Sequence, residues 1–318
     1  MKKLLLLMLM VLPVVAIAAD PVKIDGIMYY IQSKTNTAEV AQKSSGYEGC
    51  VVIPASVTYD GVTYPVTTIG ECAFSTSSSV TSVTIPNTVT TIRLSAFRGC
   101  SQLTSVIIGT GVTTIETFAF SGCSSLTSVT LPDNLKSIGV GAFSGCWKLK
   151  SINIPNSINK IEMKVFEGCS SLTSFTIPSS VSIIETSAFC GCGLTSILIP
   201  EGVTTIGYDA FYGCRELKSI TISNSVTTIS NGAFELCDNL TTVSIGNGVT
   251  SFGKDVFAYC GKLNSITITC AVPARIGEDV FAAVPLSKAT LHVPAEYIDS
   301  YKSKWPWSYF GRIVAIKE

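Results

Sequence analysis

The most reactive side chains in this sequence belong to its twelve cysteines, and eight of them recur at an almost constant interval. Cysteines spaced in this way could form crosslinks, bind a metal, or mark equivalent positions in a repeated structure. The only close pair, Cys190-Gly191-Cys192, is weak evidence for zinc because no second Cys or His pair lies nearby. Each of the eight regular cysteines follows a phenylalanine by three residues: Cys100, Cys123, Cys146, Cys169, Cys192, Cys214, Cys237 and Cys260.

The other residue types that commonly carry catalysis do not converge in the sequence. His292, in "ATLHVPAEY", is the only histidine, and nothing near it supplies the carboxylate that would orient it as a general base. The carboxylates are scattered between the Ile and the Phe of successive repeats, as in "IETFAF" and "GKDVF", which indicates solvated loop edges. Neither a Walker sequence nor an H-E-x-x-H motif is present. The sequence therefore predicts no enzyme, no cofactor and no metal site.

A repeat of about 23 residues organises the chain. The unit reads V-T-T-I-x-x-x-A-F-x-G-C-x-x-L-T-S-V-T-I-P-x-x, and successive copies are 22 to 24 residues apart. This period predicts about ten stacked coils. The aligned phenylalanines are Phe74, Phe97, Phe120, Phe143, Phe166, Phe189, Phe211, Phe234, Phe257 and Phe281.

Each part of the unit has a physical role in such a coil. The alternating apolar residues of L-x-x-V-x-I, for example Leu103, Val106 and Ile108, predict a short strand with those side chains inward. V-x-x-I buries two more apolar residues on a second side, and A-F-x-G-C predicts a short helical or turn piece. No coil can bury its Phe alone, so stacking must build one continuous core.

The unit, with A-F-x-G-C and L-T-S-V-T-I-P, resembles the BspA-type leucine-rich repeat of bacterial surface and secreted proteins. The resemblance extends from about Asp20 to the C-terminal "IVAI". It implies a repeat solenoid, a right-handed leucine-rich-repeat coil with short parallel β-strands and short helical turns. It also implies binding rather than catalysis, because some members are similar to adhesins for host matrix or plasma proteins or take part in coaggregation.

The ends of the chain differ from the repeat. A basic start and an apolar run before "AIAAD" predict a signal peptide at 1–19, so the mature chain is expected outside the cytoplasm. We expect an N-terminal β cap at 20–65, the leucine-rich-repeat solenoid at 66–285 and a C-terminal cap at 286–318. The last segment concentrates aromatic residues that would close the final coil: Trp305, Trp307, Tyr309 and Phe310.

Composition narrows the class of partner. The net charge is zero and only 14% of residues are charged, against about 25% in average proteins. Nucleic acid binding and electrostatic membrane binding both need clustered Lys and Arg, so neither is expected. No membrane span is expected after signal cleavage, and no cysteine beside the cleavage site indicates a lipoprotein anchor.

Surface recognition is then the expected function. Outward residues of the L-T-S-V-T-I strands form rows of Thr, which can simply satisfy β-propensity and solubility. Residues that interrupt these rows are the better candidates for ligand contact: Ile107, Lys150, Asn153, Leu198 and Lys218. The same interruptions disfavour an ice-binding Thr lattice.

Two classes of function remain open. The first is a non-enzymatic secreted or cell-surface protein that mediates adhesion through its repeat surface, with an extracellular protein or glycoprotein as ligand. The alternative is a structural, self-associating exterior scaffold with no specific ligand. An enzyme would be indicated only if a pocket in the C-terminal cap gathered His292 with Lys or carboxylate groups.

The regular cysteines fit the repeat better than they fit crosslinking. Equivalent Cα atoms of neighbouring coils would lie about 4.8 Å apart, a distance that allows a disulfide. Stacked side chains point in parallel, however, and the position suits a small apolar thiol. We therefore predict eight free, buried thiols. Cys50 and Cys72, outside the regular phase, are the first candidates for a disulfide.

Overall fold

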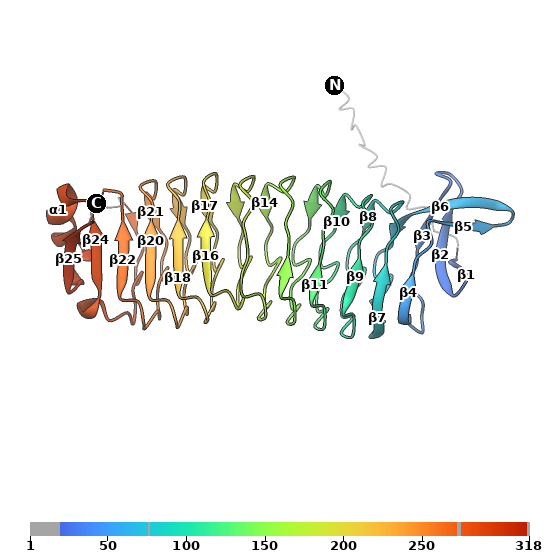
Figure 1. The fold of residues 1–318 in the computed structure, drawn as a ribbon, viewed down its shortest axis with the longest axis horizontal. Coiled ribbons are helices and arrows are strands. Elements are labelled where there is room, and N and C mark those ends of the chain that lie inside the picture. Colours follow the sequence, from blue (N-terminus) through green and yellow to red (C-terminus); the bar gives the residue numbers. More distant parts are fainter. Residues whose placement is uncertain (1–19, 76, 272–274, 317–318) are drawn as a thin grey trace, which may run out of the picture.

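The computed structural model describes residues 20–75, 77–271 and 275–316, so the expected signal peptide lies outside the described residues. The chain winds into a β-solenoid of about 11 turns of ~23 residues, with mostly parallel strands and few helices. Its coils stack along one axis from the N-terminal strands to the C-terminal helix α1 (Figure 1). The predicted fold class is confirmed.

Most coils contribute two short strands, one from each apolar segment of the repeat, whereas coil 158–180 contributes only the first. The N-terminal strands are β1 (Val22–Ile24), β2 (Ile27–Gln32), β3 (Thr37–Val40), β4 (Glu48–Val52), β5 (Ser56–Tyr59) and β6 (Val62–Ile69). The V-T-T-I segments form β8 (Thr91–Ile92), β10 (Thr114–Ile115), β12 (Ser137–Ile138), β14 (Lys160–Ile161), β15 (Ile183–Ile184), β17 (Thr205–Ile206), β19 (Thr228–Ile229), β21 (Ser251–Phe252) and β23 (Arg275–Ile276). The L-T-S-V-T-I segments form β7 (Ser79–Thr84), β9 (Ser105–Ile107), β11 (Ser128–Val129), β13 (Ser151–Ile152), β16 (Ser196–Ile199), β18 (Ser219–Ile222), β20 (Thr242–Ile245), β22 (Ser265–Ile268) and β24 (Thr290–Val293). The chain closes with η1 (Leu286–Lys288), η2 (Ala295–Tyr297), α1 (Ile298–Lys302), η3 (Trp307–Tyr309) and β25 (Arg312–Ala315).

Equivalent residues pair in register between coils. We call the side built from the V-T-T-I strands the V face and the side built from the L-T-S-V-T-I strands the L face. On the V face, Ile115 pairs with Ile92 and Ile138. On the L face, Ile220 pairs with Ile197. Because the register is kept, each inward side chain lies on its counterpart in the next coil and the core is continuous.

The repeat phenylalanines form a column through the middle of this core. From Phe74 to Phe257 every one of them has no exposed surface. Neighbouring rings are stacked, as in Phe97–Phe120, with centroids 5.0 Å apart and planes 4° apart. Tyr47 closes the column at one end, 4.5 Å from Phe74, and Trp307 closes the other, 5.5 Å from Phe281.

The C-terminal aromatic residues divide into two pairs. Trp307 and Phe310 are buried against the last coil, whereas Trp305 and Tyr309 are exposed. Only part of the predicted aromatic plug therefore packs on the column.

The A-F-x-G-C segments form turns, which is the second of the two local structures expected for them. Among the described residues, the only α-helix is α1, outside the repeats. Two positions in each coil take left-handed backbone angles, for example Lys164 with φ 60° and Gly168 with φ 74°. A right-handed helix cannot contain such residues, because the left-handed region costs an ordinary residue about 1–2 kcal/mol. We call this third side of the coil the turn side.

The regular cysteines are hydrogen-bond donors within the turn side. Each thiol donates to the carbonyl oxygen of the phenylalanine in the preceding coil, at 3.0 to 3.4 Å. All twelve cysteines are free, and the eight regular ones are buried. Burial raises the pKa of the Cys169 and Cys214 thiols to about 12. They are inert donors that bind one coil to the next.

The expected Cys50–Cys72 pairing is wrong. Cys50 is exposed on β4, which belongs to the L face, whereas Cys72 follows β6 on the V face. Hydrogen bonds from Ser82 and Thr81 lower the pKa of the Cys50 thiol.

Thiol labelling should distinguish the exposed Cys50 from the buried regular cysteines. In the folded protein we expect an alkylating reagent at neutral pH to modify Cys50 first, because it is exposed and ionises more readily than a buried thiol. After unfolding without reductant, all twelve thiols should react. Mass spectrometry of the labelled peptides measures both. Fewer than eight reactive thiols in the unfolded protein would contradict the free-thiol assignment.

Candidate functional site

The outward rows of the L face were the predicted ligand surface. Threonines of the row that follows the strand Leu form hydrogen bonds between neighbouring coils. In the row that follows the strand Leu, Thr104 Oγ1 donates to the carbonyl of Thr81 at 2.9 Å, and Thr241 Oγ1 donates to that of Lys218 at 3.0 Å. These hydroxyls join neighbouring coils. The threonines are therefore accounted for by the fold, and the departures from the row remain as candidates.

Ile107 and Leu198 are the apolar departures. Their side chains are 64% and 61% exposed on β9 and β16, although large aliphatic side chains elsewhere in the repeats are mostly buried. Four coils separate them, which corresponds to about 19 Å along the L face. Each presents an apolar contact to a partner on the same side of the solenoid.

Lys150 and Lys218 are the charged departures. Both are exposed, and neither ammonium group forms an ion pair with any described residue. Their backbone N–H groups continue the ladder to Thr127 and Thr195, each at 2.9 Å. The two side chains thus add positive charge to the L face, and their ammonium groups form no ion pair with the described residues.

Asn153 has a specific structural contact. Its Oδ1 accepts the backbone N–H of Leu131 at 3.3 Å. The equivalent N–H of Ile85 instead donates to a backbone carbonyl, that of Ile107, at 2.9 Å. The Asn153 side chain therefore replaces a ladder bond, because the strand beyond Ile152 has separated from regular pairing.

This separation belongs to a break in both sheets. On the V face the first sheet ends at β12 and the next begins at β14. On the L face the first sheet ends at β13 and the next begins at β16, so residues 174–177 pair with neither. The turn side stays closed, since Phe143 N donates to the carbonyl of Val165 at 3.0 Å. We call this contact between coils 135–157 and 158–180 the joint.

Overpacking in coil 158–180 explains the joint. Phe175 occupies the inward strand position held by Val129, Ile152 and Ile197 in other coils, and Val165 stands where neighbouring coils have Ala. The centroid of the Phe175 ring lies 5.2 Å from that of Phe166 and 4.9 Å from that of Phe189. Inserting extra volume into a packed core forces backbone shifts. Accordingly, the Phe143 and Phe166 rings are 6.1 Å apart, the widest spacing in the stacked column.

The joint leaves a groove on the L face. Its volume is about 320 Å³, and it runs between residues 151–156 and residues 174–178. Ile152 and Phe175 are half-buried in it, and Asn153, Ser174 and Thr176 are exposed around them. In this region the backbone of 174–177 has no strand partner among the described residues. The groove therefore offers apolar surface beside free peptide groups.

The five predicted residues do not converge on one pocket. Asn153 lines the groove, whereas Ile107, Lys150, Leu198 and Lys218 are spread along the L face on either side of it. Phe175 was missed, although its aromatic ring at an aliphatic position of the repeat was visible in "SLTSFTIP".

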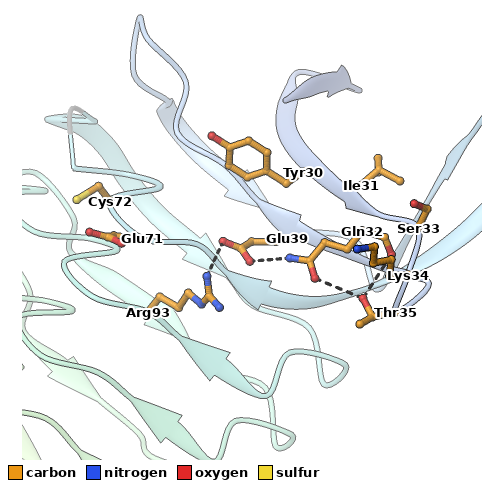
Figure 2. Close-up of a pocket in the computed structure, with 10 residues that line it drawn as sticks. All are labelled: Tyr30, Ile31, Gln32, Ser33, Lys34, Thr35, Glu39, Glu71, Cys72 and Arg93. Atoms are coloured by element: carbon orange, nitrogen blue, oxygen red, sulfur yellow. Dashed lines mark hydrogen bonds and ion pairs between the residues drawn. The ribbon is translucent and has the colours of Figure 1, made fainter. Parts of the chain in front are cut away.

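A second hollow lies at the N-terminal end, between the β2–β3 hairpin and the first V-face strands (Figure 2). Its volume is about 760 Å³. Glu39 Oε1 lies 3.3 Å from Arg93 Nη1, and Glu39 Oε2 accepts a hydrogen bond from Gln32 Nε2 at 3.1 Å. Sequence reasoning missed this pocket because no motif links residues that are 54 positions apart.

Glu39 is the only charged residue buried in the described part of the chain, with 7% of its surface exposed. Burial raises the pKa of its carboxyl above the ordinary value, and the effect outweighs the opposing influence of Arg93 and Gln32. The ion pair does not fully offset the loss of hydration, as is typical of buried charges.

The described residues of the C-terminal segment do not bring a Lys or a carboxylate to His292. A groove of about 440 Å³ contains His292 together with Thr267, Thr290 and Arg312. No carboxylate lines it among the described residues, so nothing there orients the imidazole. The same part of the chain contains no cluster of three or more His, Cys, Asp or Glu side chains suited to a metal ion. It also contains no helix long and apolar enough to cross a membrane.

In-register coils with a buried Phe column and a strand in most L-x-x-V-x-I segments define a leucine-rich-repeat solenoid. The model of the BspA type leucine rich repeat region matches residues 56–173 and 159–288. Together these ranges cover well over half of the chain, which belongs to this family.

Two solved structures resemble this chain, and the first of them supports the same fold. A leucine rich cell surface protein from Faecalibacterium prausnitzii is 26% identical, with a TM-score of 0.60, 94% of this chain and 96% of that chain being covered. A leucine-rich repeat protein from Bacteroides ovatus is 25% identical, with a TM-score of 0.47, over 93% and 100% of the two chains. A search of curated proteins finds no significant match.

The cause assigned to the joint predicts the effect of Phe175→Ile. The smaller aliphatic side chain should let residues 174–177 pair with β13 and β16, so their amides should exchange with deuterium roughly tenfold more slowly. Hydrogen exchange with mass spectrometry of peptides covering 150–180 measures this. Val129→Ile, in a coil with closed ladders, is the control and should leave these peptides unchanged. Unaltered exchange in Phe175→Ile would show that the aromatic ring is not the cause.

The raised pKa of Glu39 predicts how stability depends on pH. The unfolded carboxyl ionises at lower pH than the folded one, so the native state loses stability as pH rises through that interval. Glu39→Gln removes this loss. The free energy of unfolding of the variant, measured relative to that of the parent, should therefore be higher at pH 7 than at pH 4. Urea unfolding at both pH values measures the change. The exposed Glu216→Gln should show no such gain, and a constant difference for Glu39→Gln would refute the assignment.

Proposed function

We propose that this protein is exported and acts outside the cytoplasm as a non-enzymatic binding protein, engaging an extracellular protein or glycoprotein through its L face. The observation that carries the proposal is the pair of exposed apolar side chains, Ile107 and Leu198, on either side of a groove with unpaired backbone. Apolar side chains gathered on one face are typical of interaction surfaces, and the half-buried Ile152 and Phe175 of the groove lie in the coils between these two residues.

The chemistry of the L face suits a polypeptide partner. Peptide groups of residues 174–177 lack strand partners, and an extended segment can supply the missing hydrogen bonds while its side chains enter neighbouring pockets. Ile152 and Phe175 give such a side chain an apolar floor. Lys150 and Lys218 favour a partner with acidic groups near the contact. The relative from Faecalibacterium prausnitzii is a cell surface protein, which supports the same location here.

The scaffold alternative receives less support from the ends of the solenoid. Tyr47 covers the first ring of the Phe column, and Trp307 and Phe310 cover the last. End-to-end stacking would require exposed column ends. Light scattering at high concentration tests this point, and we expect a monomer.

Binding to a panel of purified extracellular-matrix and plasma glycoproteins tests the proposal. The double variant Ile107→Asp, Leu198→Asp should weaken binding roughly tenfold or more, because it replaces two apolar contacts by charge. Interferometry with immobilised panel members measures the affinity. The matched control is Tyr208→Asp, Tyr259→Asp, which changes exposed aromatic residues on the turn side and should bind like the parent. Absence of binding across the panel, or equal loss in both variants, would contradict the proposal.

A further inference from the structure

The N-terminal hollow has the size and construction of a small-ligand site. Its volume of about 760 Å³ lies within the usual range of about 300–1,000 Å³ for ligand pockets. Figure 2 shows Tyr30 on one side, the Glu39–Arg93 pair on another, and Glu71 with Cys72 on a third. These groups come from three separate parts of the chain, which meet only in the folded structure.

Glu39 is placed there at a cost in stability. A buried carboxylate is unfavourable unless it is well paired, and Arg93 gives only partial compensation because its side chain is 48% exposed. The fold also clears space for the carboxylate. A Cβ added to Gly70 would lie 2.5 Å from the carbonyl oxygen of Val40 and 2.7 Å from Glu39 Oε1, so the glycine makes room for both. A packed cap could have used an apolar residue at this position, so the retained charge indicates a use beyond packing.

The polar groups of the pocket are held in fixed orientations. Gln32 donates to Glu39, and Gln32 Oε1 accepts a hydrogen bond from Thr35 Oγ1 at 3.3 Å. Carboxylate, amide and guanidinium groups are planar, and each presents two neighbouring acceptors or donors. Adjacent hydroxyl groups of a polyol match such pairs, since each hydroxyl both donates and accepts. The arrangement therefore suits a ligand with several neighbouring hydroxyls.

The charges of the pocket oppose a strongly ionic ligand. Glu39 and Glu71 are balanced by Arg93 and Lys34 among the lining residues. A phosphate would meet the two carboxylates, and a compact cation would meet the guanidinium and ammonium groups. A neutral ligand avoids both penalties.

Tyr30 supplies the apolar part of the site. Its ring is half-buried on β2, where Tyr30 pairs with Glu39 of β3, and it lies beside the hydrogen-bonded groups (Figure 2). A flat aromatic ring offers a rigid apolar surface with little loss of conformational entropy, which suits the C–H face of a pyranose. Hydroxyl-matching groups beside an aromatic ring together favour a sugar over other neutral ligands.

We propose that the N-terminal pocket binds a neutral sugar unit, which stacks on Tyr30 and is hydrogen-bonded by Glu39, Arg93 and Gln32. This site is separate from the L face and does not depend on the function proposed for it. The sugar is either a free saccharide or the terminal unit of a glycan.

Saturation-transfer NMR on the full chain, with methyl glycosides of glucose, galactose, mannose, fucose and N-acetylglucosamine, tests the proposal. We expect transfer to the ring protons of at least one glycoside, and at least a fivefold loss of affinity in both Tyr30→Ala and Glu39→Gln. Tyr208→Ala is the matched control for loss of an exposed tyrosine and should bind like the parent. Melting curves and circular dichroism confirm that each variant is folded. No transfer to any glycoside, or transfer unchanged in the folded Tyr30→Ala variant, would overturn the proposal.

A second experiment distinguishes a free saccharide from the terminal unit of a glycan. Binding to a glycoprotein that is lost on enzymatic deglycosylation and competed by the free glycoside supports glycan recognition. Transfer to the free glycoside with no such competition supports a free saccharide. The variant Ile107→Asp, Leu198→Asp should keep its sugar binding, so failure of the L-face proposal and failure of the pocket proposal give different results.

Discussion

The structure depends on one constraint: each repeat phenylalanine must lie between its counterparts in the coils before and after it. A single coil of 23 residues cannot enclose a side chain of this size, so burial is achieved only by neighbours. Rings about 5 Å apart match the spacing of stacked strands, about 4.8 Å. Register, period and the covered ends all follow from this match. Tyr47 and Trp307 are needed because the first and last rings each lack a neighbouring coil.

The coils are joined with very little charge. Thiols and hydroxyls donate to carbonyl oxygens of the preceding coil, as Cys123 does to Phe97 and Thr104 does to Thr81. Such bonds cost little desolvation because the donors are neutral, and they repeat wherever the register is kept. They explain why Ser and Thr are abundant while only 14% of the residues are charged. They also explain a row of cysteines in a chain expected outside the cytoplasm, where the compartment would otherwise favour disulfides.

Periodic features could be predicted from the sequence, and features without a period could not. The Phe column, the two strands of most coils and the buried phase of Cys100 all follow from spacing. For A-F-x-G-C the sequence left a helical piece and a turn open, and left-handed residues such as Lys164 show that it is a turn. Of the candidate site, the exposure of Ile107 and Leu198 could be predicted, but the opening of both sheets depends on packing inside coil 158–180. The pocket around Glu39 requires a hairpin to meet Arg93, and spacing does not encode that contact.

Specific recognition must arise where the repeat is broken, since identical coils present identical surfaces. Two such places in the described part of the chain differ in chemistry, an apolar groove at the joint and a polar pocket at the N-terminal end. Strand β8, which precedes Arg93, lies three coils from β14 at the joint. This corresponds to a distance on the order of 15 Å along the solenoid axis. A glycoprotein is large enough to contact both with one molecule, its polypeptide at the L face and its sugar at the cap. Binding at either site would then raise the effective concentration at the other, so that two weak contacts give a stronger combined attachment.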